Sequence, residues 1–395
     1  MIPANVKPGL LRPAFPAFAN AFALALAAAA IVCSPAGAQV HLSLFHPVST
    51  NPDPNASANF ALSVFHSRIG SLNGLGLHPI VSTVGGQATG VQIVGAYSRV
   101  GGAFKGVMLT GAIASVGDDV RGLQTAGIGN FVEGGFGGIQ TAGVLNAVAG
   151  DFGGLQFASV VNMNSANTQG IQISAVANVV EGGMNGLQAA GGMNLTEGAA
   201  NGLQVAVGNI AGESRGAQIG LFNFGSRVHG LQLGAVNVAG SHSGIPIGLV
   251  NFSRQNGRVE LVAFGSTLSA ANVGVRTTVN RFQSTLSAGG IDLQGDVETA
   301  AFLTWNYGYR FPLGGAWSLG ADVGFTHIMP EKTDDPTDHD RLHFALLGRL
   351  LPEVQVSPAV AIFAGPGFAT IFDEYSQHAG SETEFLATAG LAVRP

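Results

Sequence analysis

The chain has 395 residues, of which 59 are Gly and 10% are charged, and its formal net charge is −6. This negative balance argues against nucleic acid as a partner, because a nucleic-acid-binding surface is basic. Gly-rich chains are often disordered, but disorder requires low hydrophobicity, and here Val, Leu, Ile and Ala alternate with Gly throughout. The composition therefore predicts a folded chain built mostly of small residues.

Residues 1–38 have the layout of a secretory signal peptide. Lys7 and Arg12 form a basic start, residues 18–32 form an apolar run too short to span a bilayer comfortably, and the small residues 36–38 offer a cleavage site. An exported protein that begins at Gln39 is therefore expected.

Cysteine usage excludes disulfides from the exported chain. The only cysteine, Cys33, lies inside the signal region, and residues 30–32 lack the small residue that precedes a lipidated cysteine, so no lipid anchor is expected there. Removal of residues 1–38 takes away two basic residues and no acidic one, which leaves 15 against 23 and a net charge of −8. The exported chain has no segment apolar and long enough for a transmembrane helix, so any membrane insertion must use a β-barrel.

Residues 39–73 contain two strand-like runs, 40–45 and 59–65, with a strong turn signal at 51–55 between them. They precede an internal repeat over residues 74–260.

The repeat has two landmarks that stay in phase. A Gln recurs every sixteen residues, with Met108 in one of its positions, and after Gln204 the step shortens to fourteen, with Pro246 and Glu260 in the last two positions. From Gln124 onward an Asn follows each Gln, at first by six residues and later by five, and Gly stands two residues before nearly every Gln. The landmark residues are Gln92, Gln124, Gln140, Gln156, Gln172, Gln188, Gln204, Gln218 and Gln232, with Asn130, Asn146, Asn162, Asn178, Asn194, Asn209, Asn223, Asn237 and Asn251.

Two architectures fit a repeat of this length with strand-type alternation. In an up-and-down barrel each copy is one stave, but staves alternate in direction, so the natural repeat would be a pair of strands. In a solenoid each copy is one coil, and every copy is equivalent. The loss of one residue between Gln and Asn would turn side chains to the other face of a continuous strand, whereas a corner absorbs it. We therefore predict a narrow two-sided β-solenoid with stacked Gln and Asn ladders, and keep one large β-barrel as the alternative.

Residues 261–395 have a different composition, with aromatic residues and longer strands. Tight turns alternate with the polar loops 328–340 and 373–383, which is typical of an outer-membrane β-barrel. Eight strands are predicted, at 258–268, 271–280, 282–291, 298–311, 317–327, 341–351, 359–372 and 385–393. An interfacial aromatic girdle is expected from Trp305, Tyr307, Tyr309, Phe311 and Trp317, although the chain does not end in the aromatic residue common in such barrels.

The repeat Gly-Leu-Gln-x5-Asn, its late shift to a shorter unit and its closing sequence at 244–252 resemble a family of bacterial surface-repeat proteins. The resemblance covers roughly residues 74–290. It implies an exported envelope protein with a strand-rich C-terminal region, and it brings no catalytic residues.

Acidic residues recur nine positions after Gln, as Glu133, Glu181, Glu197 and Glu213. The last three come from consecutive copies, so they are expected to align along one edge of a solenoid. Such an edge is either a weak Ca²⁺ stripe or a solvated turn position, and the lack of an Asp-rich turn around it favours the second.

The loop 328–340 carries Glu331, Asp334, Asp335, Asp338, His339 and Asp340, and it is flanked by His327 and His343. These are metal-ligand types, but two prolines predict an irregular loop, and no His pair has helical spacing. The array offers one carboxylate per turn and no facing pair of the kind that polysaccharide cleavage needs. We therefore expect no metal, no cofactor and no enzyme.

The sequence as a whole predicts an all-β, non-enzymatic protein of the outer membrane or surface of a Gram-negative-type bacterium, with a structural or interaction role. Its expected partners are outer-membrane lipid and an unidentified surface ligand or protein. One alternative is an outer-membrane pore or transporter formed by a large barrel. The other is a polysaccharide-active enzyme on a β-helix.

Overall fold

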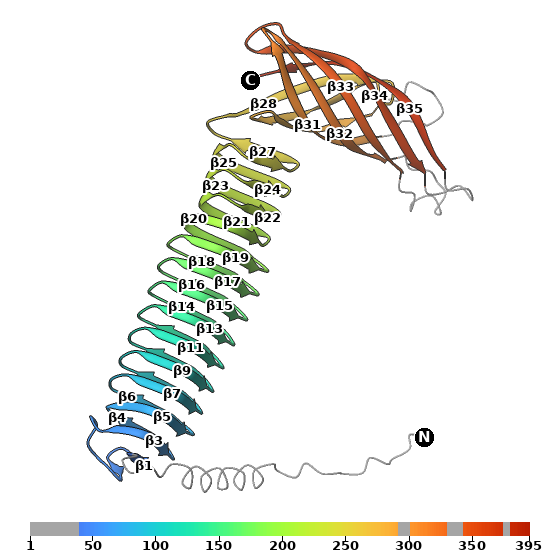
Figure 1. Cartoon of the computed structure of the whole chain (residues 1–395). Helices are drawn as coiled ribbons and strands as arrows, with labels where there is room; N and C mark the ends of the chain where they lie inside the picture. Colours follow the sequence, from blue (N-terminus) through green and yellow to red (C-terminus); the bar gives the residue numbers. More distant parts are fainter. Residues whose placement is uncertain (1–38, 291–300, 330–342, 374–379) are drawn as a thin grey trace, which may run out of the picture. The chain divides into compact units, whose positions relative to one another are not determined.

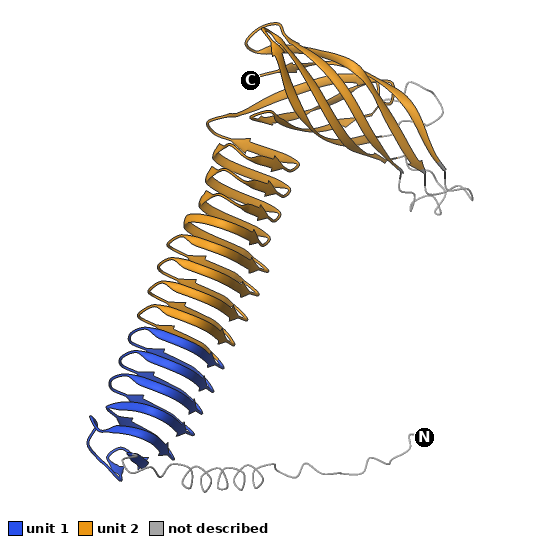
Figure 2. Ribbon diagram, in the orientation of Figure 1, with its two compact units in different colours: residues 1–127 blue, residues 128–395 orange. Residues whose placement is uncertain are grey.

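The structure is a computed structural model, and it describes residues 39–290, 301–329, 343–373 and 380–395. The chain divides into two compact units, residues 1–127 and residues 128–395 (Figure 2). The fold is all-β: a β-solenoid followed by a closed antiparallel eight-stranded barrel. The signal-peptide region predicted at residues 1–38 lies outside the described residues.

The first unit consists of stacked solenoid coils. Strands β1, β3, β5, β7, β9 and β11 pair in parallel on one side, and β4, β6, β8 and β10 pair in parallel on the other. Parallel coils already begin at residue 40, so the stacking starts well before residue 74, where the sequence repeat becomes visible. The strands are β1 (Val40–Phe45), β2 (Val48–Ser49), β3 (Ser57–Ser63), β4 (His66–Ile69), β5 (Ser71–His78), β6 (Val81–Val84), β7 (Ala88–Val94), β8 (Tyr97–Val100), β9 (Phe104–Thr110), β10 (Ile113–Val116) and β11 (Val120–Ala126).

The second unit begins with further coils, visible as stacked ribbons in Figure 1. One side carries the Gln strands and the other carries the Asn strands. Those strands are β12 (Gly129–Val132), β13 (Phe136–Ala142), β14 (Leu145–Val148), β15 (Phe152–Ala158), β16 (Val161–Asn164), β17 (Thr168–Ser174), β18 (Ala177–Val180), β19 (Met184–Ala190), β20 (Met193–Val205), β21 (Gly208–Ser214), β22 (Ala217–Ile219), β23 (Phe222–Val228), β24 (Leu231–Leu233), β25 (Val236–His242), β26 (Ile245–Ile247) and β27 (Val250–Ser253).

The register of these coils rules out barrel staves. Gln156 is paired with Gln172 and Asn162 with Asn178, in parallel and sixteen residues apart. After the coil change the offset is fourteen, as between Gln204 and Gln218, and the register shifts between Thr196 and Ala199. The alternative of one large barrel built from the repeats is therefore wrong, and the solenoid prediction is confirmed.

Glycine is required two residues before Gln by the backbone itself. Gly170 has a φ of +140°, and a Cβ there would lie 2.0 Å from the carbonyl oxygen of Gly154 in the preceding coil. Only glycine adopts this conformation freely and lets two backbones approach so closely.

The barrel consists of β28 (Gly257–Ser266), β29 (Asn272–Val279), β30 (Phe282–Gly289), β31 (Ala301–Gly314), β32 (Trp317–Met329), β33 (His343–Gln355), β34 (Val360–Asp373) and β35 (Gly380–Val393). Neighbours pair antiparallel, and β28 closes on β35, with Leu261 opposite Val393. The eight predicted strands are confirmed. Glu260, which the fourteen-residue step assigns to the repeat, lies in the barrel strand β28, so the coils end at β27 and not at residue 260.

The last coil is capped by the outer wall of the barrel. The Ser284 hydroxyl donates to the Gly248 carbonyl at 2.7 Å, and the Asn251 N–H donates to the Thr277 hydroxyl at 3.3 Å. The Tyr307 hydroxyl donates to the Pro246 carbonyl at 2.9 Å. These bonds satisfy backbone groups that the end of a solenoid would otherwise expose as an unpaired edge.

Candidate functional site

The predicted Gln ladder forms in the interior of the coils. From Gln156 to Gln232, each side-chain Nε2 donates to Oε1 of the Gln in the preceding coil, at 2.8–2.9 Å. These side chains are almost entirely buried. In the first unit Gln92 donates to the Ser82 hydroxyl at 2.7 Å, and Gln124 contacts the Met108 sulfur at 3.8 Å.

The Asn ladder runs from Asn130 to Asn251, and its side chains bond both to one another and to the backbone. Each Nδ2 donates to Oδ1 of the Asn in the following coil, at 2.7–3.0 Å. The same Nδ2, in every coil from Asn130 to Asn237, also donates to the backbone carbonyl of the residue after the Gln position of the next coil, as from Asn178 to Ala189 at 2.9 Å; for Asn237 that position holds Pro246. The Asn side chain thus satisfies a carbonyl at the corner, and this explains why an amide recurs there in every coil.

The two ladders have opposite polarity. Gln amides donate toward the preceding coil and Asn amides toward the following one, so their side-chain dipoles oppose each other. The Gln ladder is interrupted where the next coil has no side-chain N–H at the Gln position. Met108 follows Gln92 in this way and Pro246 follows Gln232, and the Oε1 atoms of both glutamines are buried without a partner. Because almost all of their donors and acceptors are used inside the protein, the ladders are structural and offer nothing to a ligand.

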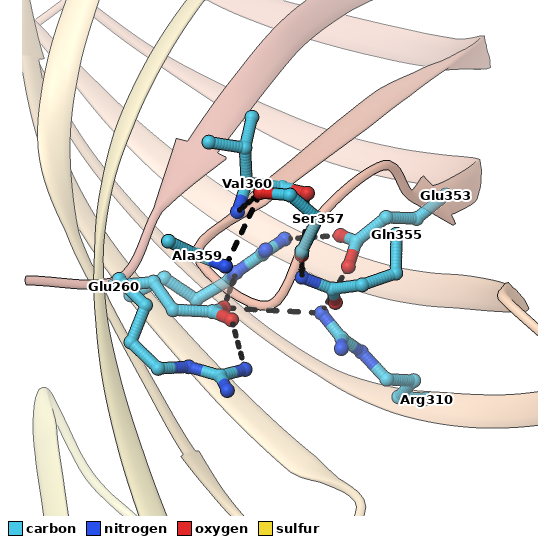
Figure 3. Close-up of polar contacts among 9 residues, drawn as sticks. Glu260, Arg310, Glu353, Gln355, Ser357, Ala359 and Val360 are labelled. Atoms are coloured by element: carbon cyan, nitrogen blue, oxygen red, sulfur yellow. Dashed lines mark hydrogen bonds and ion pairs between the residues drawn. The ribbon is translucent and has the colours of Figure 1, made fainter.

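The barrel lumen holds a cluster of buried ion pairs, part of which Figure 3 shows. Arg276 lies between Glu260 and Glu353, with N–O distances of 2.8 Å to each. Arg310 Nη2 lies 2.7 Å from Glu353 and 3.9 Å from Glu260. Arg394, near the C-terminus, has its Nη2 atom 3.4 Å from Oε1 of Glu260.

A second layer of the lumen is closed by Arg349 and Asp322. The guanidinium group makes a two-pronged contact with the carboxylate, at 2.8 and 3.0 Å. Arg349 also lies over the ring of Phe264 at 5.5 Å, and Arg276 lies over Phe363 at 5.6 Å. The cavity between the two layers has a volume of only about 20 Å³, room for about one water molecule, so these side chains narrow the lumen at this level.

The outer wall of the barrel has the opposite character. Val273, Val323 and Phe368 are 67%, 67% and 62% exposed, and they belong to a set of large apolar side chains on the outside of the strands. The others include Leu261, Val275, Leu303, Phe311, Leu313, Trp317, Phe325, Leu346, Leu350, Ile362, Phe385 and Leu391. An apolar outside around a charged inside is the pattern of a barrel in lipid.

The expected aromatic girdle is partly engaged elsewhere. Tyr309 contacts Phe311 and Phe282, with ring centroids 4.8 and 5.2 Å apart, and Trp317 is exposed. Trp305, however, donates from its indole N–H to the Ser284 hydroxyl at 2.9 Å and lies against the last solenoid coil, as Tyr307 does.

The predicted alignment of three glutamates is wrong. Glu213 lies opposite Ala199 and not beside Glu197, because the register shift at the coil change moves the following residues along. Glu213 instead contacts Arg215 at 2.8 Å, Arg227 at 3.1 Å and His229 at 3.3 Å. Hydrogen bonds from Arg215 and then Arg227 lower the pKa of Glu213 to about 2.

His229 also contacts the Ser243 hydroxyl at 2.8 Å through Nδ1, which gives a Ser–His–Glu sequence of contacts. Two guanidinium groups already neutralise the glutamate, and the Ser243–His229 contact is on the exposed side of the coils. A triad carboxylate acts by holding and stabilising an imidazolium, a role for which this glutamate has little charge left. The arrangement is therefore a surface polar network.

Buried histidines lie both in the first coils and near the end of the solenoid. His78 Nδ1 lies 3.0 Å from the Ser63 hydroxyl, and both His78 and His41 are buried. Burial, and to a smaller extent the neighbouring His41, lowers the pKa of His78 to about 3. His242, near the end of the solenoid, has its pKa lowered to about 4 by burial.

The acidic loop segment at 330–342 lies outside the described residues. Among the residues that the structure does describe, no group of three or more His, Cys, Asp or Glu side chains is placed to hold a metal ion. Over the same residues, no helix is long and apolar enough to cross a membrane.

The lumen cluster was missed at the sequence level, although a signal exists. Arg276, Arg310, Arg349, Glu260 and Glu353 each stand directly next to an apolar or aromatic residue of their strand, which are Val275, Phe311, Leu350, Leu261 and Val354. In a barrel strand such a residue must face inward. Comparison of the chain with family models, with curated proteins and with solved structures returns no match.

Proposed function

We propose that this chain is a non-enzymatic protein of a bacterial outer membrane, in which the barrel is a closed anchor and the solenoid has a structural or interaction role. The observation that carries the proposal is the contrast between the two sides of the barrel wall: exposed apolar side chains outside, and paired charges inside.

The lengths of five of the eight barrel strands fit this role. Strands β31 to β35 have 13 or 14 residues. At about 3.3 Å per residue and a tilt of about 40°, they rise roughly 33 Å, more than the apolar band of about 25 Å in such barrels. Burial of charged groups in the lumen is supported by their mutual pairing, whereas most of the apolar side chains on the outside are exposed and would contact lipid.

The connections support a direction across the membrane. Residues 280–281, 315–316 and 356–359 are the short turns at one end of the strands, and the solenoid enters the barrel at this same end. In outer-membrane barrels the short turns face the periplasm. We therefore place the solenoid on the periplasmic side.

The closed lumen argues for an anchor over a pore. The ion pairs cross the lumen at this level, and the cavity between them has room for about one water molecule. Two measurements test the proposal on the full chain after reconstitution in phospholipid vesicles. We expect protection of the barrel from added protease, with a folded form that migrates faster than the boiled form on a denaturing gel. We also expect no unitary conductance in planar bilayers. Full cleavage of the barrel contradicts the anchor, and stable conductance steps revive the pore.

A further inference from the structure

Charge is segregated along the coils of the second unit. All charged residues of 128–253 lie between an Asn position and the next Gln position. They are Glu133, Asp151, Glu181, Glu197, Glu213, Arg215 and Arg227. We call this side of each coil the polar edge.

The opposite corner, between each Gln strand and the following Asn strand, carries no charge. It consists of the pairs 143–144, 159–160, 175–176, 191–192, 206–207, 220–221, 234–235 and 248–249, mostly a small residue followed by an apolar one. We call it the apolar edge. Val144, Val176, Val207, Leu221 and Leu249 project from it and are 41–55% exposed.

The flat faces next to the apolar edge are apolar as well. Phe222, Phe224 and Phe252 on the Asn side, and Val205 and Leu233 on the Gln side, are exposed. The coils thus bury their amide ladders together with apolar side chains such as Phe152 and Met184, and they expose further aliphatic and aromatic groups outside. A monomeric soluble protein rarely exposes large continuous apolar patches, and a partner on this edge would cover these exposed side chains.

The lipid-facing wall of the barrel identifies that partner. An apolar groove of about 600 Å³ is lined by Val207, Leu221 and Leu249 of the apolar edge and by Trp305 of the barrel. Trp305 belongs to the outward row of β31 that continues with Tyr307 and Tyr309. The apolar edge therefore joins the wall that the proposed function places in lipid, at an aromatic residue of the kind enriched at bilayer interfaces.

We propose that the apolar edge of coils 128–253 is inserted into the lipid leaflet around the barrel, with the polar edge in water. The inference rests on the proposed function, because it assumes a barrel in the membrane. Insertion leaves few backbone groups unsatisfied, since hydrogen bonds run from coil to coil, the last coil is capped by the barrel, and Asn side chains satisfy corner carbonyls. A second copy of the chain on this edge is the competing occupant.

Two positions in one coil provide a matched pair for the test. Val176 lies on the apolar edge and Glu181 on the polar edge, at the two ends of β18. Each is changed to Cys in a full chain that carries Cys33→Ser, labelled with nitrobenzoxadiazole and reconstituted in phosphatidylcholine vesicles. Val323→Cys on the barrel wall serves as the lipid-exposed reference.

Nitroxide groups on the lipid acyl chains then report depth. We expect quenching at Val176→Cys to reach at least half of that at Val323→Cys, with a blue-shifted emission, while Glu181→Cys remains unquenched. Quenching of the Val323 label alone overturns the inference and leaves the anchor intact. Loss of quenching at Val323 overturns the anchor itself. A blue shift at Val176 that disappears on dilution of the protein among vesicles, without lipid quenching, assigns the edge to a second copy.

Discussion

The solenoid and the barrel solve the same physical problem in different ways. Both enclose polar side chains and expose apolar ones, but the solenoid uses neutral amides and the barrel uses ion pairs. Amide partners lie fourteen to sixteen residues apart, whereas Arg276 and Glu353 are separated by 77 residues. A local, neutral ladder can be extended coil by coil, because each amide both donates and accepts. In the lumen, Glu260 and Arg276 meet across the neighbouring strands β28 and β29, but Glu353 joins them only when the barrel closes.

This difference also separates the kinds of failure expected from single substitutions. Removal of one ladder member leaves neutral groups unsatisfied over neighbouring coils. Removal of one lumen charge leaves its partner as an uncompensated ion in a closed interior.

The largest effect is expected in the lumen. Glu353→Ala leaves Arg276 and Arg310 short of one carboxylate, so the free energy of unfolding of the barrel should fall by about 3–5 kcal/mol. Urea titration of the vesicle-bound protein, followed by the gel shift between folded and boiled forms, measures this change. Arg394→Ala serves as the control, because its side chain is 36% exposed and its contact with Glu260 is longer, 3.4 Å. Equal losses in the two variants would mean that burial does not govern the cluster.

A smaller effect is expected in the ladders, and it should differ between the two columns. Asn178→Ala removes an acceptor from Asn162 and donors from Asn194 and the Ala189 carbonyl, which should cost about 3 kcal/mol or more at about 1–3 kcal/mol per buried group. Gln172→Met should cost less, about 1–2 kcal/mol, because no corner carbonyl depends on it and Met108 already occupies one Gln position. Thermal unfolding followed by circular dichroism compares the two. A costlier Gln172→Met would refute the assignment of corner stabilisation to Asn.

Acid should weaken the first coils before the ladders. Burial lowers the pKa of His78 from its ordinary value of 6.5 to about 3 in the folded chain, so the unfolded state binds the proton more tightly. Stability is complete above pH 6.5 and falls as the pH drops toward 3, by about 2 kcal/mol at pH 5 at 1.36 kcal/mol per pH unit. Hydrogen exchange of the coils at residues 57–94 between pH 7 and pH 5 measures the loss.

His78→Val gives the matched control, since Val94 occupies the same position in the next coil. This variant should lose the pH dependence that His78 causes. If the steep pH dependence persists in it, the titration belongs to another group.

The smallest effect is expected at the polar edge. Glu213→Gln removes ion pairs with Arg215 and Arg227, whose side chains are 55% and 62% exposed, and exposed pairs contribute little. The depressed pKa of Glu213 means that these pairs persist until the pH falls from 4.5 toward about 2. The free energy of unfolding at pH 7 should match that of the unchanged chain. A large loss would mean that the Ser243–His229–Glu213 contacts stabilise the fold.

The sequence by itself determined the coils, because their partners are repeated at a fixed distance along the chain. The Gln and Asn spacing predicted two ladders, and the drop from six to five residues between them correctly placed a corner there, since Asn194 still contacts Asn209 and Gln218 still contacts Gln204. The strand pattern after residue 257 also predicted all eight barrel strands. Residues 40–73 were not assigned to the coils, because they lack the landmarks and only their parallel pairing reveals the same stacking.

The tertiary structure alone decided the contacts that depend on closure and register. Arg276, Arg310, Glu260 and Glu353 come from four strands. Arg276 already lies opposite Glu260 in the β28–β29 pair, but Arg310 and Glu353 join them only when the barrel closes. The displacement of Glu213 from the other glutamates follows from the register shift after Thr196, which equal spacing from Gln conceals. In a repeat, contacting residues are separated by a fixed, short distance along the sequence. Contacts across a barrel depend instead on how distant strands come together in space.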